Sequence, residues 1–326
     1  MSGSTKTMKA IFIDKFGGPE ELKMGHFSIH IPQTNEVQIK ILYSAVNPVD
    51  WKIRSGMLQQ RMPHHFPLIP GWDAAGVISA IGSDVKNFKV GDEVFAYCKK
   101  PMIQDGTYAE YICVDAEKHV AKKPQNLSFA QAAAIPLASL TAWQSLFESA
   151  ALEKGESIFI QAGAGGVGSL AIQFAKITGA HIITTARRCN HDYVKKLGAE
   201  QAIDYKESSI SNEIKKFAPE GLDVIFDTLG GNAFKESYSL LKPGGRLVSL
   251  IEHPNEALDK KFNVKSFYVF VKPNGKELQQ ISDLIQSGKV QPIPIQEMPL
   301  EKAAEAQEEN RQGHVQGKIV LHVQGA

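Results

Sequence analysis

Cysteine is scarce in this chain, and the three that occur exclude several kinds of structure. Cys98, Cys113 and Cys189 form an odd, widely spaced set, which argues against a disulfide framework and fits a reducing compartment. No Cys-x-x-Cys pair is present, so a four-cysteine structural zinc lobe is excluded. His64 and His65 are adjacent, which is not helical ligand spacing, and we expect them on a polar loop. Spacing alone leaves open a catalytic zinc bound by scattered side chains.

Long apolar runs and an excess of either charge are also missing. No stretch reaches the roughly 18 apolar residues of a membrane-spanning helix. The 36 basic and 35 acidic residues give a net charge of +1, which provides no electrostatic footprint for nucleic acid or an anionic membrane. Residues 1–7 precede no apolar region of the kind a signal peptide needs, so we interpret them as a loose leader before a fold that opens at Met8. The cytoplasm is the expected location.

The first third of the chain shows the pattern of a β-rich domain. At 326 residues the chain is long enough for two domains. Residues 37–41 alternate apolar and polar side chains with a period of two, as a half-buried strand does. Residues 76–82 and 92–97 are further short apolar runs separated by glycine. This spacing predicts a barrel-like or sandwich-like domain.

Helical signals begin near Ser128. Ser128 followed by Gln131 predicts a helix whose first turn is closed by a capping box. Pro136 interrupts the apolar pattern that follows, and a second helix is expected from about Ser139.

From Ser157 onward the chain alternates strands and helices, which predicts βαβ units and a doubly wound parallel sheet of the Rossmann type. The expected strands are 157–162, 181–185, 202–204, 223–227 and 245–250, and the expected helices are 167–178 and 192–197. A helix at 275–286 and a strand at 318–323 are more typical of the first region. The Rossmann domain is therefore predicted as an insertion at 131–265, between 8–130 and 266–326 of a discontinuous catalytic domain.

The strongest chemical signal is a glycine motif between the strand at 157–162 and the helix at 167–178. Its sequence gives G-x-G-x-x-G through Gly163, Gly165 and Gly168. The first glycine permits a tight turn, the second lets the backbone approach a pyrophosphate, and the third lets helix and strand pack closely. Backbone N–H groups at the start of the helix, including those of Gly166 and Val167, would bind the phosphates.

The end of the next strand indicates which nicotinamide cofactor is used. A carboxylate about 20 residues beyond the glycines usually holds the ribose hydroxyls of NAD. Here residues 184–188 read TTARR, with no carboxylate and with Arg187 and Arg188 in its place. A 2′-phosphate is attracted by guanidinium groups, so NADPH is predicted. The alternatives are that both arginines are solvated charges at a helix start, or that Asp192 takes the carboxylate's place.

Seven motifs in a fixed order between Met8 and Val323 resemble the medium-chain dehydrogenase/reductase superfamily. Within it, they are most similar to the quinone oxidoreductase (zeta-crystallin-like) branch. The motifs are 45–56 (AVNPVDWKIRSG), 70–77 (PGWDAAGV), 90–94 (VGDEV), 106–111 (GTYAEY), 134–143 (AIPLASLTAW), the glycine motif, and 317–321 (GKIVL). The resemblance implies a GroES-like catalytic domain at both chain ends, a Rossmann domain between them, an active cleft where the two meet, and a homodimer.

The same resemblance implies a reaction without metal. Zinc-dependent members place Cys where Asn47 stands and His where Trp72 stands, and neither residue here can replace such a ligand. Oxidation of a plain alcohol needs an electrophile such as zinc to lower the hydroxyl pKa. A quinone or an α,β-unsaturated ketone is already electrophilic and needs only hydride placement and hydrogen-bond donors at the developing oxyanion.

Individual site residues follow from the resemblance. Asn47 is expected to bond the substrate oxygen or the nicotinamide ribose, and otherwise to serve as a turn residue. Asp50 is expected to orient its neighbours, whereas Lys52 stands where relatives often carry Tyr and is either a proton donor or a surface charge. Relatives also often carry an aromatic residue in place of Leu58, which affects substrate preference. Further cofactor contacts are assigned to Thr141, Tyr205, Ser249, Leu250 and Ile251.

The leading hypothesis is NADPH-dependent reduction of quinones or similar electron-poor carbonyl compounds. A second enzyme hypothesis keeps the fold and cofactor but reduces the C=C bond of alkenals, enones or enoyl thioesters. A third is a nucleotide-binding protein with a structural or nucleic-acid role, against which the near-neutral charge counts.

Overall fold

The computed structural model describes residues 6–325, which divide into two compact units. The first unit runs up to Leu137 and includes 272–287 and the chain from Pro292 onward. The second unit comprises 138–271 and 288–291. These limits lie seven and six residues beyond the domain boundaries at 130 and 265 expected from the sequence, and that domain assignment stays a prediction. The leader expected at residues 1–7 lies mostly outside the described residues, and a strand already begins at Thr7.

The first unit is built on a mainly antiparallel sheet, in which, among the described strands, only β14 and β15 pair in parallel, and a separate two-stranded hairpin. The hairpin pairs β1 (Thr7–Phe12) with β2 (Lys23–Ser28). The larger sheet has the order β14-β15-β3-β4-β5-β7, and β6 also pairs with β3. Its strands are β3 (Glu36–Ala45), β4 (Asp73–Ile81), β5 (Glu93–Tyr97), β6 (Tyr111–Asp115), β7 (Val120–Lys122), β14 (Ile295–Pro299) and β15 (Lys318–His322). The strands expected at 37–41, 76–82, 92–97 and 318–323 are confirmed to within a few residues.

Strand β3 is the central element of this unit. Val37, Ile39 and Ile41 are fully buried, as their alternation predicted, and they belong to one apolar core of the unit. The register pairs Ala45 with Asp73 of β4 on one side and with Val320 of β15 on the other. Three distant segments of the sequence therefore meet at the end of β3, where helix α1 (Pro48–Arg54) begins.

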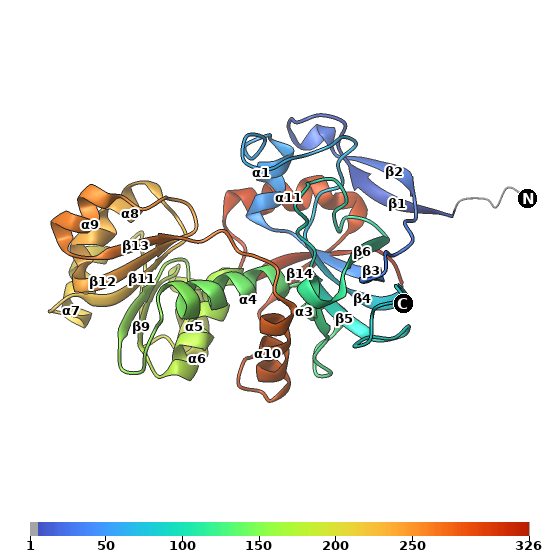
Figure 1. Ribbon diagram of the computed structural model, residues 1–326. Coiled ribbons are helices and arrows are strands. Elements are labelled where there is room, and N and C mark those ends of the chain that lie inside the picture. The colour runs from blue at the N-terminus through green and yellow to red at the C-terminus, as the bar shows by residue number, and fades with distance from the viewer. Residues whose placement is uncertain (1–5, 326) are drawn as a thin grey trace, which may run out of the picture. The chain divides into compact units, whose positions relative to one another are not determined.

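The helices of the first unit surround this sheet. They are α1, α2 (Ala116–His119), α3 (Phe129–Ala133), α10 (Gly275–Gln286) and α11 (Ala303–Gln312). Helix α10 has the bounds expected from the sequence. The capping box is confirmed, since Gln131 N donates to Ser128 Oγ at 3.2 Å and Ser128 N donates to Gln131 Oε1 at 3.0 Å. Figure 1 shows α1 and α11 together, and residues of the two helices are in contact.

The start of the next helix differs from the expectation. Helix α4 covers Pro136–Trp143 and continues as a π-helical turn at Gln144–Ser149, so it begins three residues before the expected Ser139. Proline is compatible with the first turn of a helix, because its missing N–H would have no intrahelical acceptor there. The expected break is confirmed, since α3 ends at Ala133 and α4 begins at Pro136, but the proline itself is the first residue of the second helix.

The second unit is a six-stranded parallel sheet with the order β10-β9-β8-β11-β12-β13. Its strands are β8 (Ser157–Ile160), β9 (His181–Thr185), β10 (Gln201–Ile203), β11 (Leu222–Asp227), β12 (Leu241–Ser249) and β13 (Lys265–Tyr268). Its helices are α5 (Gly166–Thr178), α6 (His191–Leu197), α7 (Ile210–Phe217), α8 (Gly231–Ser237) and α9 (Glu256–Phe262). The predicted alternation and the Rossmann-type doubly wound sheet are confirmed.

The order of connections locates the ligand edge of this sheet. The chain passes from β8 outward through β9 to β10 and then returns to β11 on the other side of β8. Right-handed crossovers then place α5 and α6 on one face and α8 and α9 on the opposite face, as Figure 1 shows. Ligands of such sheets bind beyond the carboxyl ends of the strands beside this reversal. None of the described helices in either unit is long and apolar enough to cross a membrane.

Candidate functional site

The glycine loop of the second unit forms a tight turn between β8 and α5. Gly163 N donates to Thr185 O at 2.9 Å, and Gly165 N donates to Ala162 O at 3.0 Å, which fixes the loop against β9. Gly165 is the N-cap residue of α5, and no side chain caps the helix. The first N–H groups of a helix have no acceptor within it, so those of Gly166 and Val167 are left to bind an anion.

The three motif glycines have different physical reasons to be glycine. A Cβ atom on Gly163 would lie 2.2 Å from Thr184 Oγ1, and one on Gly168 would lie 2.3 Å from Ala162 O. Both glycines are therefore required by packing within the unit. A Cβ on Gly165 would meet only Ala162 O at 3.4 Å, and its φ of −80° suits any residue. The space in front of Gly165 is kept open by the missing side chain, and this cradle fits a pyrophosphate.

Two arginines follow β9, as the sequence predicted for the adenosine end of a dinucleotide. Arg187 is half-buried, and its Nε donates to the hydroxyl of Tyr205 at 3.3 Å, while Arg188 is exposed. Sequence reasoning missed Asp204, whose carboxylate accepts the backbone N–H of Arg188 at 2.8 Å and that of Lys206 at 2.9 Å. These bonds, that of Lys206 first, hold the pKa of Asp204 below its usual value. The carboxylate thus fastens the turn that carries the arginines.

The carboxyl ends of β11 and β12 hold the backbone segment expected near the nicotinamide. Ser249 Oγ donates to Asp227 Oδ2 at 2.5 Å and accepts the N–H groups of Ile251 at 3.1 Å and Glu252 at 2.9 Å. Asp227 Oδ1 accepts the N–H groups of Leu229 and Gly230. Asp227 is fully buried and was missed, although its place at the end of an apolar strand was a usable signal.

Leu250, Ile251 and Thr141 are the other residues of this unit that were predicted to contact the cofactor. Leu250 continues directly from Ser249, and its N–H donates to Asp227 O at 3.1 Å. Ile251 is exposed at the same edge, with 38% of its surface accessible. Thr141 is buried on α4.

In the first unit, Asp50 organises the start of α1. Its Oδ2 atom accepts the Asn47 backbone N–H at 2.8 Å and the Tyr108 hydroxyl at 3.0 Å. Burial raises the pKa of Asp50 to about 7, although the bonds from Asn47 and Tyr108 oppose that rise. Asp50 is fully buried. Its contacts with Asn47 and Tyr108 are compatible with the predicted role of orienting its neighbours.

Asn47 is the N-cap residue of α1 and forms a capping box with Asp50, whose carboxylate accepts the Asn47 backbone N–H at 2.8 Å. Its Nδ2 donates to Asp73 Oδ2 at 2.8 Å, and its Oδ1 accepts from the ammonium of Lys318. Lys318 Nζ also donates to Val46 O at 3.3 Å and lies 3.7 Å from Asp73 Oδ2. Asp73 and Lys318 belong to two of the motifs that resemble the family, but no sequence pattern connects positions 73 and 318.

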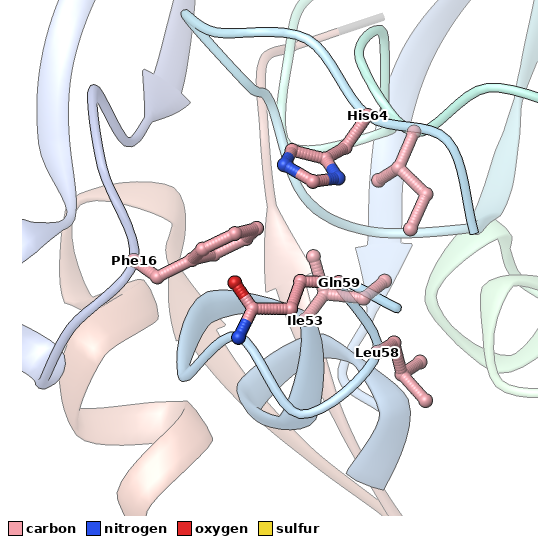
Figure 2. Close-up of a pocket in the computed structure, with 6 residues that line it drawn as sticks. Phe16, Ile53, Leu58, Gln59 and His64 are labelled. Atoms are coloured by element: carbon pink, nitrogen blue, oxygen red, sulfur yellow. The ribbon is translucent and has the colours of Figure 1, made fainter. Parts of the chain in front are cut away.

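Lys52 and Leu58 are the two positions at which the resemblance predicts a different residue. Lys52 is half-buried with its Nζ 5.6 Å from the centre of the Trp51 ring, and burial lowers its pKa. Leu58 lines a small, mainly apolar pocket, shown in Figure 2. The other lining residues are Phe16, Ile53, Gln59, His64 and Ile103. The His64 ring packs on the Phe16 ring with their centres 4.8 Å apart.

Comparison with known proteins agrees with both units. Residues 33–125 match the alcohol dehydrogenase GroES-like domain family, and residues 197–321 match the zinc-binding dehydrogenase family. The chain is 34% identical to the quinone oxidoreductase of Homo sapiens over 335 residues, covering 98% of this chain and 99% of that protein. It is 37% identical to the chloroplastic NADPH-dependent alkenal/one oxidoreductase of Arabidopsis thaliana over 327 residues, covering 97% and 80%.

A solved structure extends the comparison. The Escherichia coli quinone oxidoreductase complexed with NADPH has a TM-score of 0.85 and 28% identity, and covers 96% of this chain and 99% of that one. The GroES-like part, the parallel sheet and the glycine cradle together define an oxidoreductase that uses a nicotinamide cofactor. The chain belongs to the medium-chain dehydrogenase/reductase superfamily, on its quinone oxidoreductase branch.

The zinc ion that one matching family is named for does not fit the residues of this chain. Asn47 offers an amide whose two polar atoms already contact Asp73 and Lys318. Trp72 is buried and packs edge-on against Tyr97, with ring centres 6.1 Å apart. Within residues 6–325 no three His, Cys, Asp or Glu side chains are grouped to hold a metal. A neighbouring ammonium would also repel a divalent cation.

We predict that the motif glycines separate into a packing role and a binding role. Gly168→Ala should destabilise the protein by roughly 1–3 kcal/mol, because the added methyl group overlaps the Ala162 carbonyl. Gly165→Ala should leave stability within about 0.5 kcal/mol and weaken NADPH binding about tenfold or more, since its methyl group enters the open cradle. Thermal unfolding without cofactor and fluorescence titration with NADPH measure the two effects. Equal binding by wild type and Gly165→Ala would contradict the assignment of the cradle.

We also predict that Asp50 makes stability depend on pH. Its folded-state pKa of about 7 lies above the unfolded value of roughly 3.9, so the fold favours the protonated carboxyl. That contribution is complete below about pH 4 and is lost as pH rises to about 7, at a cost of roughly 4 kcal/mol. Asp50→Asn should remove this slope, so its stability relative to wild type should rise between pH 4.5 and 8. Urea unfolding of both proteins across that range measures the difference, and parallel curves would show that Asp50 remains ionised throughout.

Proposed function

We propose that this protein transfers hydride from NADPH to quinones or similar electron-poor carbonyl compounds without a metal ion. The observation that carries the proposal is the open cradle at Gly165 together with the arginine-bearing turn after β9, which carries no free carboxylate. The cofactor supplies hydride from the nicotinamide ring. The protein's residues bind the phosphates, hold the segment after β12 and present polar groups around Asn47.

The preference for NADPH over NADH rests on Arg187. Its guanidinium lies against the Tyr205 hydroxyl, which holds the planar donor group in one direction. Asp204, which follows β10, accepts the backbone N–H groups of Arg188 and Lys206. A 2′-phosphate at this place would gain a charge-assisted hydrogen bond from Arg187.

The choice of a quinone-type acceptor rests on the residues around Asn47. The side chains around Asn47 offer no zinc site, so they cannot lower the pKa of an alcohol hydroxyl as a metal ion does. This favours acceptors that are already electrophilic. A second candidate is reduction of the C=C bond of alkenals or enones, favoured by the 37% identity to the Arabidopsis thaliana alkenal/one oxidoreductase. Both acceptors need a donor at the developing oxyanion. A protein that binds the nucleotide without catalysis is the third candidate.

We further propose that the protein acts in the cytoplasm as a homodimer without nucleic-acid partners. The three free cysteines support a reducing compartment, and the family resemblance supports the dimer. Analytical ultracentrifugation of the purified protein tests the assembly.

A panel of acceptors tests the reaction. Steady-state oxidation of NADPH should be at least tenfold faster in kcat/KM with 1,4-quinones than with alkenals or enones of similar size. The reverse order would establish the C=C reductase instead. NADPH binding with no turnover on any acceptor would favour the non-catalytic candidate.

Arg187→Glu should abolish the preference for NADPH. Losing a charge-assisted bond and adding a repulsive carboxylate should weaken NADPH binding on the order of 100-fold, while NADH binding changes little. Lys196→Glu makes the same charge change at an exposed position of α6 and should leave both affinities unchanged. Titration of each variant with both cofactors measures the ratio. Unchanged NADPH affinity in Arg187→Glu would remove the phosphate assignment.

A further inference from the structure

In the second unit the fold brings a carboxylate to the turn after β9, where the sequence itself places arginines. The short strand β10 lies beside β9 and ends at Ile203, and Ala186 N donates to Ile203 O at 3.0 Å. The next residue is Asp204, which is buried. Its carboxylate reaches Arg188, which lies 16 residues earlier in the chain. The pairing of the two strands therefore supplies the acidic side chain that residues 184–188 lack.

The two oxygens of Asp204 join two turns. Oδ2 accepts the N–H of Arg188 at 2.8 Å, across the gap between the ends of β10 and β9. Oδ1 accepts the N–H of Lys206 at 2.9 Å and so closes the turn that contains Tyr205. Aspartate commonly stabilises turns by accepting such backbone N–H groups. One side chain thus fixes the backbone on both sides of this edge of the sheet.

The residues next to these hydrogen bonds carry the side chains that meet. Arg187 precedes Arg188, Tyr205 lies between Asp204 and Lys206, and Arg187 Nε donates to the Tyr205 hydroxyl at 3.3 Å. A long arginine side chain has many rotamers, and a ligand that orders it must offset the lost freedom. The direction of the Arg187 guanidinium before a ligand binds therefore depends on where Asp204 holds the two turns.

A carboxylate at this edge has two opposing effects on the choice of cofactor. An acidic side chain here usually binds the ribose hydroxyls of NAD and repels a 2′-phosphate, which would favour NADH. In this chain both oxygens of Asp204 are directed at backbone N–H groups. Water and salt screen a charge at the edge of a protein, whereas a hydrogen bond of 2.8 Å fixes the backbone directly. The geometric effect then outweighs the repulsion.

We propose that Asp204 is a positioning residue, which holds the turns of Arg187 and Tyr205 so that the guanidinium meets the 2′-phosphate of NADPH. The inference rests on the proposed function for the identity of the cofactor. Asp204 bonds neither the phosphate nor the reacting atoms, so it acts on the affinity for NADPH and not on hydride transfer. Its carboxylate favours the phosphorylated cofactor, although its charge alone would disfavour it.

The sign of one substitution separates these effects. Asp204→Ala removes both acceptor oxygens and the charge. Positioning predicts that the Kd for NADPH rises about tenfold, that the Kd for NADH stays within about twofold, and that kcat at saturating NADPH is unchanged. Tighter NADPH binding would show that repulsion dominates, and weaker NADH binding would make Asp204 a ribose ligand. Either result, or an unchanged Kd for NADPH, would overturn the inference.

Two further variants control for charge and for folding. Asp204→Asn has nearly the same shape and keeps one acceptor oxygen, so it should lose less NADPH affinity than Asp204→Ala. An asparagine variant that binds NADPH more tightly than wild type would overturn the inference. Glu207→Gln removes a negative charge from an exposed side chain three residues further along and should leave both affinities unchanged.

A double-variant cycle tests whether Asp204 acts through Arg187. If it does, adding Asp204→Ala to Arg187→Ala should cause little further loss of NADPH affinity. Losses that multiply would show that Asp204 acts independently of the guanidinium and would refute the positioning role.

Hydrogen exchange without cofactor reports the two bonds directly. The amides of Arg188 and Lys206 should exchange at least about tenfold faster in Asp204→Ala than in wild type, and equal rates would contradict the inference. None of these binding and exchange measurements needs a hydride acceptor. A protein that reduces no quinone but shows the expected loss of NADPH affinity would refute the proposed reaction and leave the role of Asp204 standing. A quinone reductase whose NADPH affinity is unchanged by Asp204→Ala would do the reverse.

Discussion

The first unit depends on one demanding interaction, the burial of a lysine ammonium beside an aspartate carboxylate. Removing each ion from water costs several kcal/mol, and their attraction compensates only when the geometry is good and the other polar atoms find partners. Here Lys318 contacts Asp73, Val46 O and Asn47, and Asp73 contacts Asn47 and Leu137. Burial lowers the pKa of Lys318 while Asp73 and Asp50 raise it, so the ammonium persists only in this arrangement. The fold of β15, β3 and β4 and the polar site therefore require each other.

In the second unit, backbone groups rather than side chains are available to interact with a charge. The site that we propose for a negative charge consists of helix N–H groups and the open space at Gly165, and it needs no buried charge of its own. The carboxylates near it, Asp204 and Asp227, accept backbone N–H groups and hold turns in place. Acidic side chains thus shape this edge of the sheet without occupying the cradle.

How much of each site could be predicted from the sequence depends on whether its residues are close together in the chain. The glycine loop is local, since strand, turn and helix are consecutive, and its pattern alone predicted β8, α5 and the cradle between them. The arginines after β9 were predictable for the same reason. The contacts of Asn47 are not local, because Asp73 is 26 residues away and Lys318 is 271 residues away. Only the strand register unites them, and periodicity carries no information about which strands are neighbours.

Prediction was also limited because the same residue type can serve more than one structural role. Pro136 was expected to precede a second helix that starts at Ser139, and it instead forms the first residue of that helix, because the rule against proline applies to helix interiors and not to the first turn. Asn47 is the N-cap residue of α1, and its amide also contacts Asp73 and Lys318, two partners that its position at a helix start does not predict. A cap bond is worth about 1 kcal/mol, whereas leaving a buried charge without its partner costs more. The larger energy decides the orientation, and it is invisible until the tertiary structure is known.

The position of the Lys318 ammonium determines whether it can act as zinc does in related enzymes. Zinc activates a substrate by direct coordination through an open ligand position, which lowers the pKa of a bound hydroxyl. Lys318 supplies a fixed positive charge in the first unit, but its donors point to Asn47 Oδ1 and Val46 O and its exposure is 5%. Its ammonium is therefore not placed to coordinate or polarise a substrate as a Lewis acid. A neutral donor stabilises an oxyanion that hydride transfer creates, but it cannot generate an alkoxide from an alcohol near neutral pH. The arrangement therefore favours reduction of electron-poor acceptors over oxidation of alcohols.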